Sequence, residues 1–231
     1  MTSDKNNTLQ IDIVSDVMCP WCFVGKRNFE AALPLIDDIE LNISWRPYQL
    51  DATLPKEGKD RKLYLSDKFG GEERAAEIYK RIEDAGHSVG INFKFNDIKV
   101  SPNTLDAHRL IRWAGGQSAE MQDKVVLRLF ELYFLEGENI GDHDVLVGAA
   151  ELAGMDGKLV RDLLSSPEDV EAVEAEIATA QKMGVTGVPC FIIDQKYAVS
   201  GAQSADILAK AIRHAAAEKQ EEKEYKGQDG M

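Results

Sequence analysis

Cys19-Pro20-Trp21-Cys22 follows a β-like run at 9–14 and precedes an apolar pattern of helical period. A thiol at a strand-to-helix junction lies among the free N–H groups of the first helical turn, whose dipoles favour thiolate over thiol. Cys22 comes three residues after Cys19, on the same face of the helix, where the two sulfurs can form a disulfide. The spacing therefore indicates a pair of thiols arranged for exchange chemistry.

Two other interpretations of the cysteine pair have weaker support. A structural zinc site needs four ligands, usually from a second close-spaced pair. The remaining candidates are Cys190 and four scattered histidines, none of which forms such a pair. A purely structural disulfide is unusual in so short a loop without a secretory signal. Redox chemistry is therefore the favoured prediction, and we expect no metal.

The pattern around the cysteine pair predicts an α/β fold. A strand at 9–14 is followed by an amphipathic helix that Pro34 should kink or end. Residues 41–47 alternate between apolar and polar side chains, which is typical of a half-buried strand. Together these segments predict a β-α-β unit with parallel strands. From about 54 to 184 the pattern predicts helices throughout.

The β pattern returns near the end of the chain. Residues 187–193 form an apolar run, 194–195 predict a turn, and 197–199 predict a second short strand. An amphipathic helix follows around 207–212. The order of elements is therefore β-α-β, a helical insertion, and then β-β-α.

This order divides the chain into two predicted domains. The first is discontinuous and comprises 9–53 and 185–217. The second is the all-helical insertion, 54–184. Residues 1–8 and 218–231 are polar or charged with little apolar content, so we expect them to be flexible tails.

Composition excludes several classes of partner. The 231 residues are 44% hydrophobic, which is ample for a packed core. A net charge of −13 argues against nucleic acid and anionic membranes as partners, since both require a basic face. The polar N-terminus lacks the apolar segment of a signal peptide, and no run of about 18 apolar residues predicts a membrane span. We therefore expect a cytoplasmic protein, whose oligomeric state the composition leaves open.

Three segments carry a resemblance to a known family, namely 15–22, 101–110 and 184–189. By the order and separation of these three segments, the chain resembles DsbA-like oxidoreductases of the FrnE type. These proteins are related to 2-hydroxychromene-2-carboxylate isomerases and kappa-class glutathione transferases. The resemblance implies a thioredoxin fold (β-α-β … β-β-α) with a large all-helical insertion.

The resemblance also implies the catalytic residues, which are Cys19, Cys22 and Pro189. Pro189 is expected to follow a cis peptide bond and to face the disulfide. The backbone of Val188 would then pair with an extended substrate segment, as in strand addition. The alternative is an ordinary trans proline at the start of a strand.

Further substrate-binding residues are expected around the cysteines. Pro20 and Trp21 lie between the two thiols and set the stability of the thiolate. Asn103 and His108 are expected to line a cleft over Cys19. The alternative for these two is a hydrogen-bonded structural pair that caps a helix.

Two further residues have open roles. Asp12 is a candidate proton relay beneath the thiols, if burial raises the pKa of its carboxyl group; the alternative is an ordinary strand-edge or surface aspartate. Cys190 follows Pro189, where family members commonly carry an aromatic or aliphatic residue. Its apolar neighbours predict a buried, inert thiol, and the alternative is a third functional thiol.

These residues predict a thiol–disulfide oxidoreductase that acts on protein or small-molecule thiols and needs no cofactor. Glutathione is a candidate redox partner. One alternative is a glutathione-dependent isomerase or transferase acting on a small aromatic substrate. Those relatives generally replace the first motif cysteine with serine, whereas this chain keeps Cys19. A second alternative is a chaperone or binding module that retains the motif without catalysis.

Overall fold

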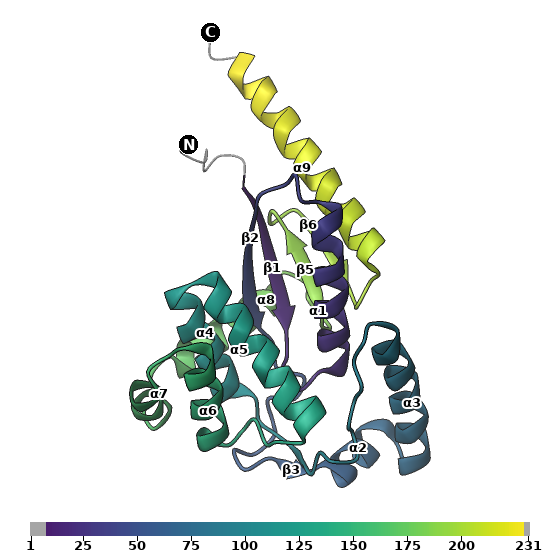
Figure 1. Ribbon diagram of the computed structural model, residues 1–231, viewed down its shortest axis with the longest axis vertical. Coiled ribbons are helices and arrows are strands. Elements are labelled where there is room, and N and C mark those ends of the chain that lie inside the picture. Colours follow the sequence, from purple (N-terminus) through teal and green to yellow (C-terminus); the bar gives the residue numbers. More distant parts are fainter. Residues whose placement is uncertain (1–7, 229–231) are drawn as a thin grey trace.

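The computed structural model describes residues 8–228 and contains a mixed four-stranded sheet with helices on both faces (Figure 1). β1 (Leu9–Ser15) runs parallel to β2 (Leu41–Pro47) and antiparallel to β5 (Cys190–Ile193). β5 in turn pairs antiparallel with β6 (Tyr197–Ser200), which gives the strand order β2-β1-β5-β6. The β-α-β and β-β-α halves thus meet in one sheet, which confirms the predicted thioredoxin fold.

Helices cover both faces of this sheet. α1 (Pro20–Ala32) and α9 (Ala205–Gln228) pack together on one face, and α8 (Val170–Lys182) lies on the other. Side chains alternate across a strand, so Ile13 of β1 joins the main core with α1. Val14 points the other way, into a small cluster beneath α8.

The first β-α-β unit keeps close to its predicted bounds. β1 and β2 pair in register from Leu9 opposite Leu41 to Ser15 opposite Pro47. α1 ends directly before a short 3₁₀ turn at Leu33–Leu35. Pro34 lies in this turn and has no N–H to continue the α-helical bonding, as predicted.

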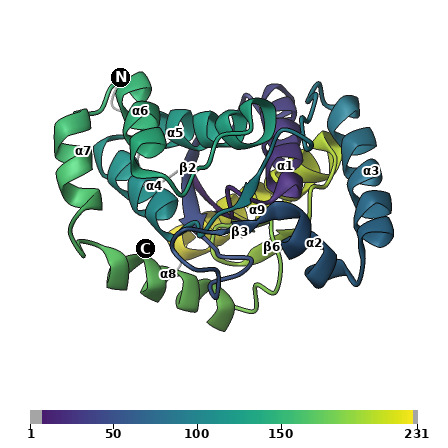
Figure 2. The same ribbon diagram turned by 90° about the horizontal axis from the view of Figure 1, so that it is seen from below.

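The insertion is mainly helical and lies on two sides of the lower end of the sheet. Its helices are α2 (Arg61–Phe69), α3 (Glu72–Ser88), α4 (Leu105–Gln117), α5 (Ala119–Glu131), a π-helical turn at Leu132–Glu136, α6 (His143–Ala153), α7 (Gly157–Leu164) and α8. Figure 2 shows α4, α5, α6 and α7 on one side and α2 and α3 on the other, with α1 between them.

The insertion also contains a short pair of strands, so the prediction of helices throughout 54–184 is wrong at this point. β3 (Lys59–Asp60) pairs antiparallel with β4 (Val100–Ser101). Two residues per strand are too few to produce an alternating apolar pattern. The pairing brings together segments that flank α2 and α3, which no local pattern predicts.

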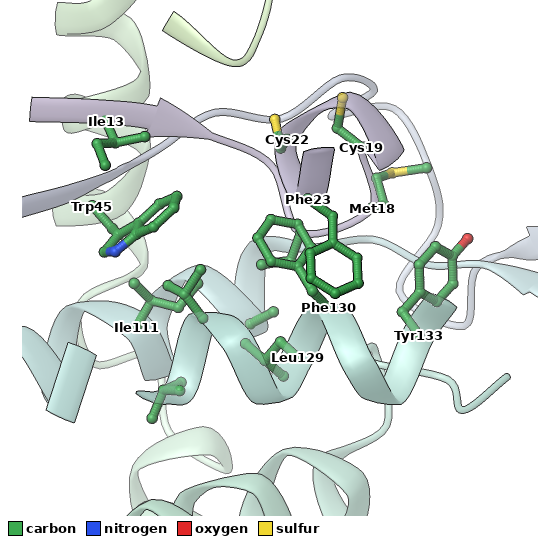
Figure 3. Packing of buried hydrophobic residues seen from close by; sticks show 14 of the residues in the cluster. Ile13, Met18, Cys19, Cys22, Phe23, Trp45, Ile111, Leu129, Phe130 and Tyr133 are labelled. Atoms are coloured by element: carbon green, nitrogen blue, oxygen red, sulfur yellow. The ribbon is translucent and has the colours of Figure 1, made fainter. Parts of the chain in front are cut away.

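Aromatic side chains join the insertion to the sheet through α1. The ring of Phe23 stacks on Phe130 of α5, with centroids 5.1 Å apart and an interplanar angle of 4°. Phe93 and Phe134 also contact Phe23. Figure 3 shows the contact between Phe23 and Phe130 beneath the start of α1. The sheet and the insertion therefore share one hydrophobic core.

α9 is longer than the sequence predicts. It continues to Gln228 and so includes 218–228, which the sequence predicts to be a tail, while 1–7 and 229–231 lie outside the described residues. The charged residues of this segment are good helix formers, and the Nζ atom of Lys219 lies 2.6 Å from a carboxylate oxygen of Asp194. Neither α9 nor any other helix within 8–228 is long and apolar enough to cross a membrane.

Candidate functional site

The two motif cysteines occupy the first turn of α1. Cys19 is the N-cap residue, with extended backbone angles (φ −92°, ψ 113°), and Pro20 takes the first helical position. Proline suits this position because its missing N–H would have no partner there. The N–H of Cys22 donates to the carbonyl oxygen of Cys19 at 3.0 Å. Both side chains are free thiols, and Figure 3 shows them at the same end of the helix, as predicted.

The residues of the motif differ in how deeply they are buried. Cys19 and Cys22 are only 4% and 1% exposed, whereas Trp21 is 39% exposed. The Cys19 thiol donates to the carbonyl oxygen of Val188, with 3.7 Å between sulfur and oxygen. Trp21 is therefore the exposed side chain of the motif, and the Cys19 sulfur is nearly covered.

The environment of Cys22 opposes its ionisation. Burial raises the pKa of the Cys22 thiol well above its usual value, and the hydrogen bond and charge of the adjacent Cys19 raise it further. The Ser15 hydroxyl and the Asp16 backbone act in the opposite direction and lower this pKa. The reduced Cys22 thus remains a thiol at neutral pH.

The loop at 185–189, called here the proline loop, packs against α1. The peptide bond between Val188 and Pro189 is cis, as the family resemblance implies. The loop approaches α1 so closely at Gly25 that a Cβ atom there would lie 2.7 Å from Cγ of Pro189. Glycine is thus the residue that permits this contact. The catalytic role of Pro189 and the substrate-pairing role of Val188 stay predictions.

Cys190 is buried, as predicted. It is 2% exposed and belongs to the small cluster beneath α8, together with Val14 and Ile192. Its neighbour Phe191 points to the opposite face, where it stacks on Phe29 of α1. Burial raises the pKa of the Cys190 thiol. The strand therefore directs this third thiol away from the face that α1 covers.

His108 is held inside a hydrogen-bonded network that the sequence did not reveal. Its Nε2 atom lies 2.8 Å from the carbonyl oxygen of Tyr48 and 3.5 Å from Oδ1 of Asp16. A carbonyl oxygen can only accept, so Nε2 carries a hydrogen. Both side chains are buried, His108 to 3% exposure and Asp16 to 0%. His108 thus packs beneath the segment that leads to the cysteines, and its predicted cleft role stays a prediction.

Asp16 is the residue of this network that sequence reasoning missed. Its carboxylate accepts from the N–H of Leu50 at 2.8 Å and of Met18 at 3.3 Å, and its carbonyl accepts from the N–H of Cys19 at 2.9 Å. An acidic residue between an apolar strand and an apolar Val-Met pair was the available signal, because such a carboxylate is buried only with partners. Asp16 fixes the backbone that enters the motif.

Asn103 forms part of a different set of contacts from His108. Its Nδ2 donates to the carbonyl oxygen of Leu54 at 2.7 Å, and its Oδ1 accepts from Gln49 at 3.0 Å and from the N–H of Leu105 at 3.0 Å. It therefore holds the start of α4 against the segment after β2. This agrees with the alternative of a helix-capping residue, although His108 is not its partner.

The structure favours the ordinary alternative for Asp12. Its Oδ1 accepts from Nε of Arg46 at 2.7 Å and from Gln10 at 3.1 Å. Asp12 alternates with Ile13 along β1, so its side chain points away from the face that α1 covers. This position does not lie beneath Cys22, and the relay prediction gains no support from the geometry.

Comparisons with known proteins agree with this architecture. Residues 10–213 match the model of the DSBA-like thioredoxin domain. The crystal structure of the probable DsbA oxidoreductase SCO1869 from Streptomyces coelicolor is similar, with 30% identity, 91% of each chain covered and a TM-score of 0.82. The uncharacterized protein YwbO of Bacillus subtilis is 28% identical over 207 residues, which cover 89% of this chain and 96% of that protein.

A solved 2-hydroxychromene-2-carboxylate isomerase is also similar in fold, with a TM-score of 0.68 at 14% identity over 92% of this chain and 98% of that one. The fold is thus shared by proteins described as oxidoreductase and as isomerase. The family model extends from the first strand into the last helix. The chain therefore belongs to the DSBA-like thioredoxin-domain family.

Proposed function

We propose that the protein is a thiol–disulfide oxidoreductase that exchanges a Cys19–Cys22 dithiol or disulfide with protein or small-molecule thiols. One observation carries the proposal. Cys19 begins α1 beside the Val188 carbonyl, and Cys22 lies one turn in and is more deeply buried. This arrangement supports Cys19 as the thiol that reacts with a substrate and Cys22 as the thiol that reacts with Cys19.

In the oxidising direction, a substrate thiolate attacks the Cys19 sulfur of the disulfide. The Cys19–Cys22 bond breaks, and its electron pair leaves with Cys22 as a thiolate that then takes a proton. A second substrate thiolate attacks the substrate sulfur of the mixed disulfide and releases Cys19. The substrate dithiol has then lost two electrons, and the protein has gained them.

In the reducing direction the same bonds form and break in reverse. The Cys19 thiolate attacks a substrate disulfide and displaces one substrate thiolate. Cys22 then gives up its proton to water, attacks the Cys19 sulfur and displaces the second substrate thiolate. The high pKa of Cys22 keeps it protonated until Cys19 has reacted, which favours the predicted order of nucleophile and resolving thiol.

The surface around Cys19 suits an extended substrate. The exposed Trp21 offers an apolar contact, and the Val188 carbonyl is the acceptor that a substrate backbone N–H would reach by strand addition. Glutathione, a small peptide with one thiol, fits the same contacts and is proposed as a redox partner. No cofactor takes part in these steps.

The rival function is a glutathione-dependent isomerase or transferase that binds a small aromatic substrate. A cavity of about 710 Å³ lies beside β2 and is lined by His108, Trp45 and Arg112, among others, but by neither motif cysteine. An aromatic molecule bound there would not touch the thiols. Retention of Cys19, where the isomerase relatives generally carry serine, also favours the oxidoreductase.

Reduction of insulin by dithiothreitol, followed by turbidity, tests the proposal. We expect the wild-type protein to accelerate precipitation and Cys19→Ser to abolish the effect. Cys22→Ser should accumulate mixed disulfides with the substrate. Cys190→Ala is the matched control that removes a thiol outside the motif. Absence of acceleration by the wild type, together with turnover of glutathione and a chromophoric aromatic substrate, would establish the rival function. Cell fractionation tests the predicted cytoplasmic location.

A further inference from the structure

The hydroxyl of Ser15 occupies an unusual position at the end of β1. Leu9, Ile11 and Ile13 alternate along this strand and belong to the core that α1 covers. Ser15 continues the same alternation, so its side chain points to the same face. At that end of the strand, the face is covered by the first turn of α1, which carries Cys22. Ser15 is only 4% exposed.

This hydroxyl is buried without a hydrogen-bond partner. Most buried polar groups in proteins are hydrogen-bonded, so such a group calls for a physical explanation. The adjacent Cys22 offers an explanation. The Ser15 hydroxyl and the Asp16 backbone are the groups that favour the ionised form of the Cys22 thiol. A thiol needs little from these donors, whereas a buried thiolate needs them strongly.

The backbone that carries both donors is held by hydrogen bonds. The carbonyl oxygen of Ser15 accepts from the N–H of Tyr48 at 3.0 Å. The carboxylate of Asp16 is bound by the N–H of Leu50 and lies 3.5 Å from Nε2 of His108. The segment that presents the two donors is therefore preorganised, and no rearrangement is needed when charge develops on the sulfur.

We propose that the Ser15 hydroxyl and the Asp16 backbone N–H form a hydrogen-bonding site for the Cys22 thiolate. The inference rests on the proposed exchange reaction. When a thiolate attacks Cys19 of the disulfide, the Cys19–Cys22 bond breaks and its electron pair moves to the Cys22 sulfur. The two donors stabilise that charge until the sulfur takes a proton from water. In the reverse step they stabilise Cys22 as it attacks the mixed disulfide.

The test measures how fast dithiothreitol opens the oxidised protein, by acid quenching, alkylation and mass spectrometry. We expect Ser15→Ala to slow opening about threefold. Loss of a hydrogen bond to a charged sulfur raises the pKa of the leaving thiol by about one unit, and exchange rates follow about half of such a change. Ser101→Ala is the matched control, because Ser101 is also a buried serine at the end of a strand whose hydroxyl has no partner.

A second measurement separates this role from a general effect on the fold. Reduced Cys22 is a thiol at neutral pH, so Ser15→Ala should change the equilibrium constant with glutathione less than about twofold. If Ser15→Ala does not fold, the isosteric variants Ser15→Thr and Ser15→Val replace it. The Cys19–Cys22 disulfide of the threonine variant should then open about threefold faster than that of the valine variant.

The outcomes separate the two proposals. A wild-type disulfide that forms and opens, but at the same rate in the Ser15 variants or equally slowly in Ser101→Ala, refutes the Ser15 inference alone. A wild-type protein whose motif forms no disulfide that dithiothreitol can open refutes the proposed function itself.

Discussion

Replacing Gly25 by alanine tests how closely the proline loop packs on the helix that carries the thiols. The added Cβ would lie 2.7 Å from Cγ and 3.4 Å from Cβ of Pro189, and 3.5 Å from Phe191. A carbon atom cannot remain 2.7 Å from another nonbonded carbon, and the proline ring is fixed to the backbone. The methyl group must therefore push the proline loop away from α1.

The expected change in the free energy of unfolding follows from two opposing effects. Alanine is favoured over glycine inside a helix by about 1 kcal/mol, whereas forcing a methyl group into a packed core costs about 1–3 kcal/mol. Gly148→Ala in α6 is the matched control, since nothing lies within 4 Å of a Cβ at that position. The difference between the two variants cancels the helix propensity. We expect the free energy of unfolding of Gly25→Ala to be about 1–3 kcal/mol below that of Gly148→Ala.

Urea unfolding of the reduced proteins, followed by circular dichroism, measures this difference. The same preparations should show slower insulin reduction for Gly25→Ala, because the proline loop no longer lies against Cys19. Equal stability of the two alanine variants would refute the packing argument. So would a Gly25→Ala protein that is the more stable of the two.

Three further outcomes are expected. Iodoacetamide at neutral pH should label Cys19 before Cys22 and Cys190, because burial raises the pKa of both of the other thiols; peptide mapping that finds Cys22 or Cys190 labelled faster contradicts the assignment. Cys190→Ala should leave the reduction potential of the motif within about 30 mV; a larger shift, or a Cys190-containing disulfide in a non-reducing digest, would make Cys190 a third functional thiol. Burial tends to raise the pKa of Asp106, but the Arg109 guanidinium 2.7 Å away holds it below its usual value. The ionised Asp106 therefore stabilises the fold at pH values above the ordinary carboxyl pKa, and this stabilisation is lost as the pH falls through the lowered pKa of the folded state. Asp106→Asn should accordingly make the melting temperature depend less on pH in the acidic range.

Patterns within short stretches of the sequence predicted the strands, the first helix and the position of the two thiols. Alternation gave the long strands, and the Cys-x-x-Cys spacing placed both thiols at the start of α1. Two contacts between distant segments were missed. The contact of Asp16 with His108 joins residues far apart in sequence, and the β3–β4 pair is too short to carry a pattern. Asp12 is a candidate proton relay from the sequence, yet strand alternation turns its side chain away from the face that α1 covers.

The contact between Cys19 and the Val188 carbonyl joins residues 169 positions apart. Closing so long a loop is among the slower events in folding, because its entropy is lost before the contact is gained. During synthesis the two thiols emerge from the ribosome long before the proline loop exists. Until the last strands add to the sheet, the pair stays uncovered and open to oxidation or alkylation. The time at which these thiols become protected from a small alkylating reagent should therefore report when the fold is complete.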